Sequence, residues 1–199
     1  KTIMKRSSII LLSVAGILIL AIFWGVSKYN GLVTKDEAVS GQWANVENQY
    51  QRRADLIPNL VATVKGYASH ESETLEGVVA ARAKATQITV DPNNLTPEKL
   101  QQYQAAQGEL SSALGKLLMI TENYPELKAN QNFLELQAQL EGTENRITTE
   151  RGRFNELSKD FNATVRKFPT NIVASLAGFE KKAYFEAEEG SEKAPEVKF

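Results

Sequence analysis

The sequence of 199 residues contains no cysteine and only one histidine, His70. Without cysteine there is no disulfide, no thiolate nucleophile and no cysteine-ligated zinc or iron–sulfur site. One histidine excludes a metal site with two histidine ligands in one chain, and a Ser-His-Asp triad would depend on His70. His70-Glu71 lacks the second histidine of a zincin helix, so we expect a surface or capped side chain. We therefore expect no enzyme, with no catalytic residue, metal site, cofactor or small-molecule substrate.

The chain also lacks an excess of positive charge. Its 23 Lys and Arg and 24 Asp and Glu give a formal net charge of −1. A general nucleic-acid binder carries a clustered basic excess, so we expect no nucleic-acid partner. The charges are unevenly distributed, because four basic residues and no acidic residue precede residue 31. Residues 31–199 therefore carry 19 basic and 24 acidic residues, a net charge of −5.

A long uncharged stretch lies near the start of the sequence, from residue 7 to residue 27. A helix of 21 residues spans about 31 Å, which is close to the hydrocarbon thickness of a bilayer. A cleaved signal peptide has a shorter apolar stretch and small residues at its cleavage site, where this chain has bulky ones. The sequence therefore predicts an uncleaved transmembrane helix over residues 7–28 in contact with the lipid bilayer. Trp24 and Tyr29 fit the aromatic belt at the membrane interface.

The charges that flank this stretch indicate its orientation. Lys1, Lys5 and Arg6 precede it, whereas Lys28 and Lys35 follow it. By the positive-inside rule the N-terminal tip lies in the cytoplasm, and the remainder of the chain then lies outside the cytoplasm.

Beyond residue 31, proline and glycine are sparse and no segment alternates β-branched with polar residues, so the sequence predicts an all-α fold. Breaks between helices are expected at Asn30-Gly31, Asp91-Pro92-Asn93-Asn94, Tyr124-Pro125 and Phe168-Pro169. These breaks leave long helices at about residues 34–87, 96–123 and 126–167, and a short fourth helix around 172–179.

Two of the predicted helices have recognisable starts. Thr34 and Glu37 have the spacing of a capping box. Thr96 is an N-cap residue followed by Pro97 at the first helical position.

Pro58 conflicts with the first predicted helix. An interior proline removes a hydrogen bond and clashes with the preceding turn, at a cost of about 3 kcal/mol. We expect a kink at this point rather than a domain boundary. The side chains of Asp55 and Asn59 are close enough in sequence to satisfy the freed backbone groups.

Each long helix carries an apolar stripe, with alternating spacings of three and four residues in the first two and a spacing of seven in the third. In the first helix the stripe is Val39, Trp43, Val46, Tyr50, Arg53, Ile57, Leu60, Val64 and Tyr67. In the second it is Leu100, Tyr103, Gln107, Leu110, Leu114, Leu117, Thr121 and Tyr124. In the third it is Phe133, Leu140, Ile147, Phe154, Phe161 and Phe168.

A seven-residue repeat favours left-handed packing, and short links make neighbouring helices antiparallel. The predicted fold is an N-terminal transmembrane helix followed by an elongated antiparallel three- to four-helix bundle with long coiled-coil-like helices. Apolar residues outside the stripes are expected to form a second interface: Leu56, Val61, Leu118, Met119, Leu127 and Leu134.

The most informative polar cluster contains Arg52, Arg53 and Asp55. Arg53 occupies a stripe position, where burial requires a paired carboxylate. We expect its partner among Glu141, Glu144 and Glu150, in a buried polar layer that sets the register of the helices. The polar segment Gly142-Thr143-Glu144-Asn145-Arg146 adds Arg146 to the candidates. Alternatively, Arg53 extends to the surface with its aliphatic stem on the bundle.

These observations divide the chain into four predicted parts. They are a cytoplasmic tip at residues 1–6, the transmembrane helix at 7–28, the helical bundle at 29–185 and a charged tail at 186–199. The composition of the tail is typical of disorder, although it ends in the apolar residues Val197 and Phe199.

The chain resembles the LemA family of bacterial membrane proteins over nearly its whole length. The longest matching segment runs from Arg52 to Glu71 and begins Arg-Arg-Ala-Asp-Leu-Ile-Pro-Asn-Leu-Val. Further matching segments are residues 29–33, 43–47, 124–130, 133–137, 142–147, 168–171 and 194–199. The resemblance implies a membrane-anchored helical protein of bacterial origin, hence in the inner membrane with a periplasmic C-terminal domain. It also suggests that the tail is part of the structure.

The sequence favours a non-enzymatic scaffold of the cell envelope that acts by self-assembly, as a homo-oligomer, or by binding a partner. The alternative is a regulatory adaptor of a membrane protease or sensor kinase, because helical bundles can switch between two packings. A membrane protease or another envelope protein is the partner that the resemblance suggests.

Overall fold

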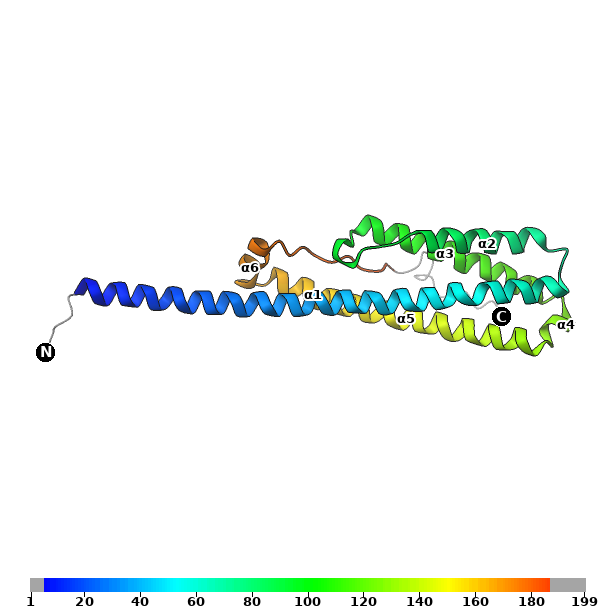
Figure 1. Ribbon diagram of the computed structural model, residues 1–199, viewed down its shortest axis with the longest axis horizontal. Coiled ribbons are helices and arrows are strands. Elements are labelled where there is room, and N and C mark those ends of the chain that lie inside the picture. Colours follow the sequence, from blue (N-terminus) through cyan, green and yellow to red (C-terminus); the bar gives the residue numbers. More distant parts are fainter. Residues whose placement is uncertain (1–5, 187–199) are drawn as a thin grey trace, which may run out of the picture. The chain divides into compact units, whose positions relative to one another are not determined.

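The computed structural model describes residues 6–186, and its regular structure in that range is helical, which confirms the all-α prediction (Figure 1). The elements are α1 (Arg6–Tyr67), α2 (Ser72–Gln87), the 3₁₀-helix η1 (Pro92–Asn94), α3 (Pro97–Thr121), α4 (Pro125–Lys128), α5 (Gln131–Arg166) and α6 (Thr170–Ala177). Residues 1–5 of the predicted tip and 187–199 of the predicted tail lie outside the described range. The predicted domain boundaries stay predictions.

The chain forms two compact units, each of which takes part of α1 and part of α5. Among the described residues, the first unit contains residues 6–39 together with Leu157–Lys181. The second contains Ser40–Glu156 and residues 182–186.

The second unit is a four-helix bundle. Figure 1 shows the cyan part of α1 beside the yellow part of α5, and the green helices α2 and α3 beside each other. The chain reverses direction between α1 and α2, between α2 and α3, and again through α4 into α5 (Figure 1). Each connection is short, so neighbouring helices are antiparallel, as the link lengths predict.

The fourth helix of this bundle is α2, which corrects the prediction of one helix over residues 34–87. Helix α1 ends at Tyr67, and α2 begins at Ser72 after a turn closed by a bond from the Glu71 amide to the Ala68 carbonyl (3.1 Å). Tyr124 fixes this turn, because its hydroxyl donates to the Glu71 carboxylate (2.9 Å). His70 lies in the turn and is exposed.

The starts of α3 and α5 differ in how well the sequence predicts them. Thr96 caps α3 as expected, because its hydroxyl accepts from the Lys99 amide. The third predicted helix, at 126–167, is divided into α4 and α5 instead. Asn130 provides the cap of α5, since its side-chain oxygen accepts from the Phe133 amide (3.0 Å).

The three predicted stripes form the interior with few exceptions. Trp43, Ile57, Val64, Leu117 and Phe154 are among the residues with no measurable exposure. The exceptions lie at the ends of stripes: Tyr67 is 41% exposed, Phe168 is 79% exposed and Tyr124 is half-buried. An apolar side chain at the last position of a stripe has no facing turn to cover it.

The six apolar residues predicted to form a second interface differ in burial. Leu127 is fully buried in the core, so the prediction is wrong for this residue. Leu56, Val61 and Leu118 are partly buried against the same core. Met119 and Leu134 are exposed, at 72% and 44%.

In the first unit, aromatic contacts join α1 to the chain that follows α6. The ring of Phe179 lies 5.8 Å from that of Tyr29 and 6.1 Å from that of Phe161. Lys35 forms an ion pair with Asp160 of α5 (2.6 Å). Helix α6 ends at Ala177 and is capped by Gly178, which adopts the left-handed conformation (φ 75°) that favours glycine.

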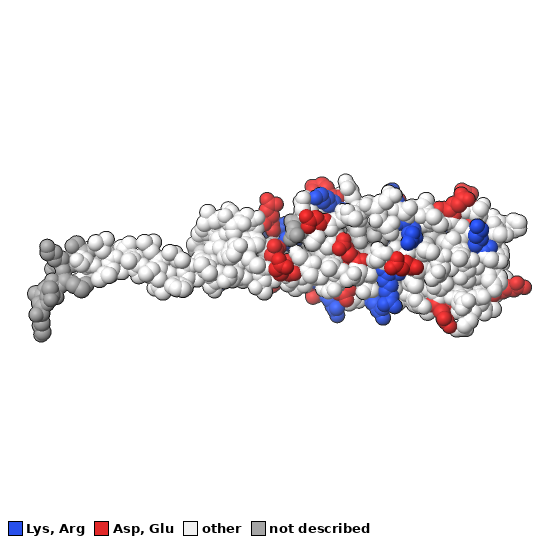
Figure 2. All heavy atoms as spheres, viewed as in Figure 1, with Lys and Arg blue, Asp and Glu red and all other residues white. Residues whose placement is uncertain are grey.

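The N-terminal part of α1 presents apolar side chains to its surroundings. Its most apolar window has a mean hydropathy of 2.8 with no residue buried, and by length and composition this helix is able to cross a membrane. The charged spheres of Figure 2 are absent from this part of the helix. Trp24 and Tyr29, the predicted interfacial residues, are 38% and 46% exposed.

Helix α1 does not break at Asn30-Gly31, which corrects another prediction. The Thr34 hydroxyl donates to the Asn30 carbonyl (3.0 Å), a bond within a continuing helix rather than a cap. Asparagine and glycine lower the stability of a helix interior without forbidding it, and a helix of 62 residues has enough bonds to compensate.

Helix α1 also continues through Pro58, and a residue of α2 compensates for the lost bond. Because Pro58 has no N–H, the Ala54 carbonyl four residues earlier has no helical donor. The Nε of Arg82 donates to this carbonyl (2.7 Å). Asp55 and Asn59, which the sequence analysis proposed for this role, are exposed.

This arrangement makes Pro58 and Arg82 energetically coupled. We expect Arg82→Ala to lower the free energy of unfolding by about 1–3 kcal/mol, because it leaves a buried carbonyl unpaired. In a Pro58→Ala background the new N–H satisfies that carbonyl, so the same substitution should cost about 1 kcal/mol less. Denaturant unfolding of the four variants in detergent measures the coupling. Strictly additive effects would contradict it, and Arg52→Ala, at an exposed site, is the control.

Candidate functional site

A buried arginine is the centre of the polar layer between α1, α3 and α5. Arg53 is 1% exposed. Its Nη1 donates to the Glu144 carboxylate (2.7 Å) and to the Ser111 hydroxyl (2.7 Å). Its Nη2 donates to the side-chain oxygen (2.6 Å) and the backbone carbonyl (3.1 Å) of Gln107. Both terminal nitrogens therefore have acceptors, whereas the buried Nε has no hydrogen-bond partner among the described residues.

The charge of Arg53 has two sources of compensation. One is Glu144, whose side chain is 43% exposed and so remains partly hydrated. The other is the ring of Tyr50, whose centroid lies 5.1 Å from the guanidinium carbon in a cation–π contact. An arginine that binds three helix-borne groups in a fixed fork geometry restricts how the helices slide past each other.

The other predicted site residues lie outside this layer. Glu150 accepts from the Gln42 side chain instead (2.6 Å), and Glu141 is exposed. The remaining five are exposed: Arg52, Asp55, Pro58, Asn59 and Arg146.

Sequence reasoning missed the role of Gln107. It was assigned to the apolar stripe of the second helix, and it is indeed buried (7% exposed). Arg53 and Gln107 are polar residues in the apolar stripes of two different predicted helices. This shared feature is the signal that could have paired them. Ser111 gave no such signal, because an exposed serine is ordinary on a helix.

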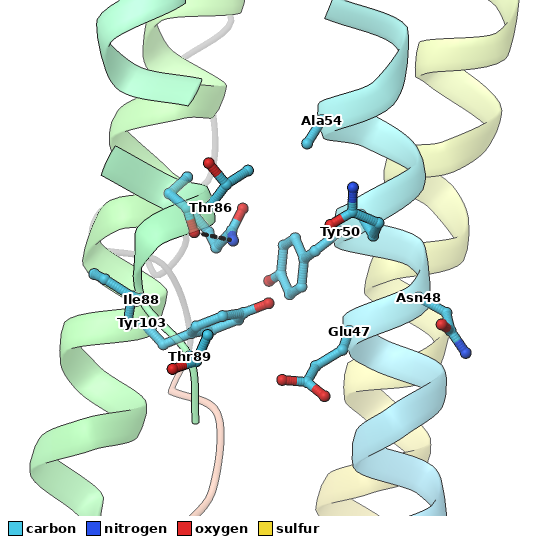
Figure 3. A pocket seen from close by; sticks show the side chains of 11 residues that line it. Glu47, Asn48, Tyr50, Ala54, Thr86, Ile88, Thr89 and Tyr103 are labelled. Carbon is cyan, nitrogen blue, oxygen red and sulfur yellow. Dashed lines mark hydrogen bonds between the residues drawn. The ribbon is translucent and has the colours of Figure 1, made fainter. Parts of the chain in front are cut away.

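A polar cavity of about 300 Å³ lies beside the layer, between α1 and the α2–α3 pair (Figure 3). Glu47 and Tyr50 of α1 and Tyr103 of α3 point into this space in Figure 3, whereas Asn48 points away from it. The two tyrosine rings meet edge to face at 5.4 Å. Ala85, Thr86, Ile88 and Thr89 form part of the opposite wall.

The environment of this cavity alters the pKa of two of its groups. Burial raises the pKa of Glu47, against a smaller opposing effect of the nearby Trp43 indole. Burial, with the neighbouring Tyr50 and Glu47, raises the pKa of Tyr103 far above its usual range. The Tyr103 phenol is therefore neutral at physiological pH. Among the described residues of the lining, Glu47 is the one that carries a carboxylate. The described lining of the cavity offers hydrogen-bonding groups and the acidic side chain of Glu47.

The Arg53 layer leads to a test by substitution. Arg53→Ala should lower the free energy of unfolding by about 3 kcal/mol, because it leaves Gln107 and Glu144 without their donor. Arg53→Met should cost less, since it fills the space, but should relax the fixed register of the helices. Thermal melting and amide hydrogen exchange measure the two effects. An unchanged melting temperature for Arg53→Ala would refute the role of the layer, and Arg52→Ala is the exposed control.

Comparison with known proteins gives consistent matches. The magnetosome protein MamQ 2 of Paramagnetospirillum magneticum is 27% identical over 183 residues, which cover 80% of this chain and 65% of the relative. The magnetosome protein MamQ of Magnetospirillum gryphiswaldense is 26% identical over 79% of this chain and 64% of its own length. This chain thus spans slightly less than two thirds of the length of the magnetosome relatives.

A further relative is protein LemA of Metamycoplasma hominis, 26% identical over 175 residues, which cover 87% of this chain and 76% of that protein. A family model described as the LemA family matches residues 42–199, a range that includes the Arg53 layer and the cavity beside it. The chain therefore belongs to the LemA family.

Proposed function

We propose that this chain is a non-enzymatic, membrane-anchored scaffold of the bacterial cell envelope that acts by self-assembly or by binding a partner. The observation that carries the proposal is the composition of α1. One uninterrupted helix of 62 residues has an unburied apolar segment at its start and supplies a core stripe of the bundle in its second half. The apolar helix and the family support a membrane-associated helical protein.

The location follows from the charges. In this proposal residues 7–28 cross the inner membrane, the N-terminus lies in the cytoplasm and the bundle lies in the periplasm. The basic residues before the apolar segment support this orientation. The net charge of −5 beyond residue 31 supports a body that does not bind anionic lipid directly.

The bundle has a surface suited to a helical partner. A groove of about 370 Å³ runs between the end of α1 and α2, with Val61, Leu75 and Val79 among its lining residues. Val79 is 51% exposed although it is apolar. Apolar side chains exposed along a groove are characteristic of protein contact sites.

The topology is testable directly, because the chain has no cysteine to remove. We expect Ser112→Cys, at an exposed position of α3, to react with a membrane-impermeant maleimide in spheroplasts. Thr2→Cys should react only after the membrane is permeabilised. The reverse pattern would refute the orientation, and labelling of both positions in intact spheroplasts would refute the membrane anchor.

The mode of action is testable on the chain solubilised from native membranes. We expect native mass spectrometry and single-particle imaging to show a complex of several copies. A different protein present in a fixed ratio would instead favour the alternative, a regulatory adaptor of a membrane protease or sensor kinase. A monomer without a companion, confirmed by crosslinking in intact membranes, would refute the scaffold role.

A further inference from the structure

The chain from Lys182 to Glu186 is bound to the bundle as an extended peptide. Residues 178–186 form no helix, yet Phe185 is only 5% exposed. The side-chain amide of Asn155 accepts from the Phe185 amide (2.8 Å) and donates to the Phe185 carbonyl (2.9 Å). An amide side chain has a donor and an acceptor at the spacing of a peptide group, so it can replace the rung of a β-ladder.

A second amide binds the next residue in the same way. Gln104 of α3 donates to the Glu186 carbonyl (2.9 Å), and its side-chain oxygen accepts from the Glu186 amide (3.3 Å). Arg151 of α5 also donates to that carbonyl (3.0 Å). These bonds are made to the backbone, so two consecutive peptide units are held without use of the Glu186 side chain, which is exposed.

An aromatic pocket holds the Phe185 side chain between the side-chain amides of Asn155 and Gln104. The ring of Phe185 stacks on Trp43 at 5.8 Å and meets Phe154 edge to face at 5.4 Å. The guanidinium carbon of Arg151 lies 4.8 Å from the centre of the same ring. Backbone bonds from two amides together with a deep pocket for one ring are the elements of a peptide-binding site. We call the groove formed by Trp43, Gln104, Arg151, Phe154 and Asn155 the amide groove.

We propose that the amide groove is a peptide-binding site that also accepts residues 182–186 of a second copy of this chain, so that copies assemble by exchange of this segment. The fit of the segment to the groove is present within one chain, and every copy carries both parts. The segment can therefore bind the groove of a second copy with the same contacts that it makes within its own chain. The added cost is small once the segment has left its own groove. The proposal rests on the self-assembly proposed above and specifies the contact that makes it.

Two single-cysteine variants distinguish exchange from closure within one copy. One variant carries Glu186→Cys, which keeps the backbone bonds of the segment. The other carries Gln101→Cys, one turn before Gln104 on the same face of α3. The two full-length chains, with different tags, are co-expressed, solubilised and treated with a short bis-maleimide. Each copy has one cysteine, so a product that carries both tags arises only between copies.

We expect the doubly tagged product in the assembled fraction, and a loss of about tenfold when Phe185→Ala is added to the Glu186→Cys chain, because the anchor ring is gone. Phe168→Ala, which removes an exposed ring, should leave the yield unchanged. An excess of a synthetic peptide of residues 181–186 should lower the yield, and its Phe185→Ala analogue should not. The competition with the synthetic peptide uses chains whose groove residues are unaltered. This test therefore remains valid even if the Phe185→Ala protein folds poorly.

Two results would overturn the exchange. One is an assembled protein without the doubly tagged product, while a chain with both cysteines is linked internally; self-assembly would then stand and only the exchange would fail. The other is a doubly tagged product that neither Phe185→Ala nor the peptide reduces. A chain that is monomeric throughout would refute self-assembly and the exchange together.

Discussion

The burial of Arg53 is the constraint on which the packing of the bundle depends. A guanidinium in the interior is costly unless its charge and most of its donors are compensated, and here three residues from two other helices bind the terminal nitrogens. An apolar stripe alone would allow neighbouring helices to shift by a turn at small cost, because one heptad resembles the next. A fork that needs Gln107 on one helix and Glu144 on another removes that freedom.

Much of this architecture could be predicted from the sequence, because the repeat is strong. Most residues of the predicted stripes are buried in α1, α3 and α5, and Glu144 was among the predicted partners of Arg53. The end of α1 was missed because no proline or turn cluster marks it. The repeat itself contained the signal, since seven residues beyond Val64 the sequence has Glu71.

The rest of the site depends on contacts between distant parts of the chain, which no local pattern encodes. Tyr124 fixes the turn at Glu71 from 53 residues away, and Asn155 holds Phe185 from 30 residues away. The composition of the tail suggested disorder, whereas its first residue, Glu186, is bound through its backbone. Amino-acid composition reflects the properties of side chains. It therefore cannot predict a site that binds the backbone peptide groups of a segment.

The bond between Arg82 and Ala54 has a consequence for the order in which the chain folds. The hydrogen-bond ladder of the helix around Pro58 is completed by the side chain of Arg82, 28 residues after Ala54. This stretch of α1 therefore cannot reach its full stability before α2 packs against it. In the nascent chain the stretch would be a weak helix until the hairpin of α1 and α2 closes. Hairpin closure is then the event that stiffens α1, and a separation of 28 residues is short enough for that event to be early.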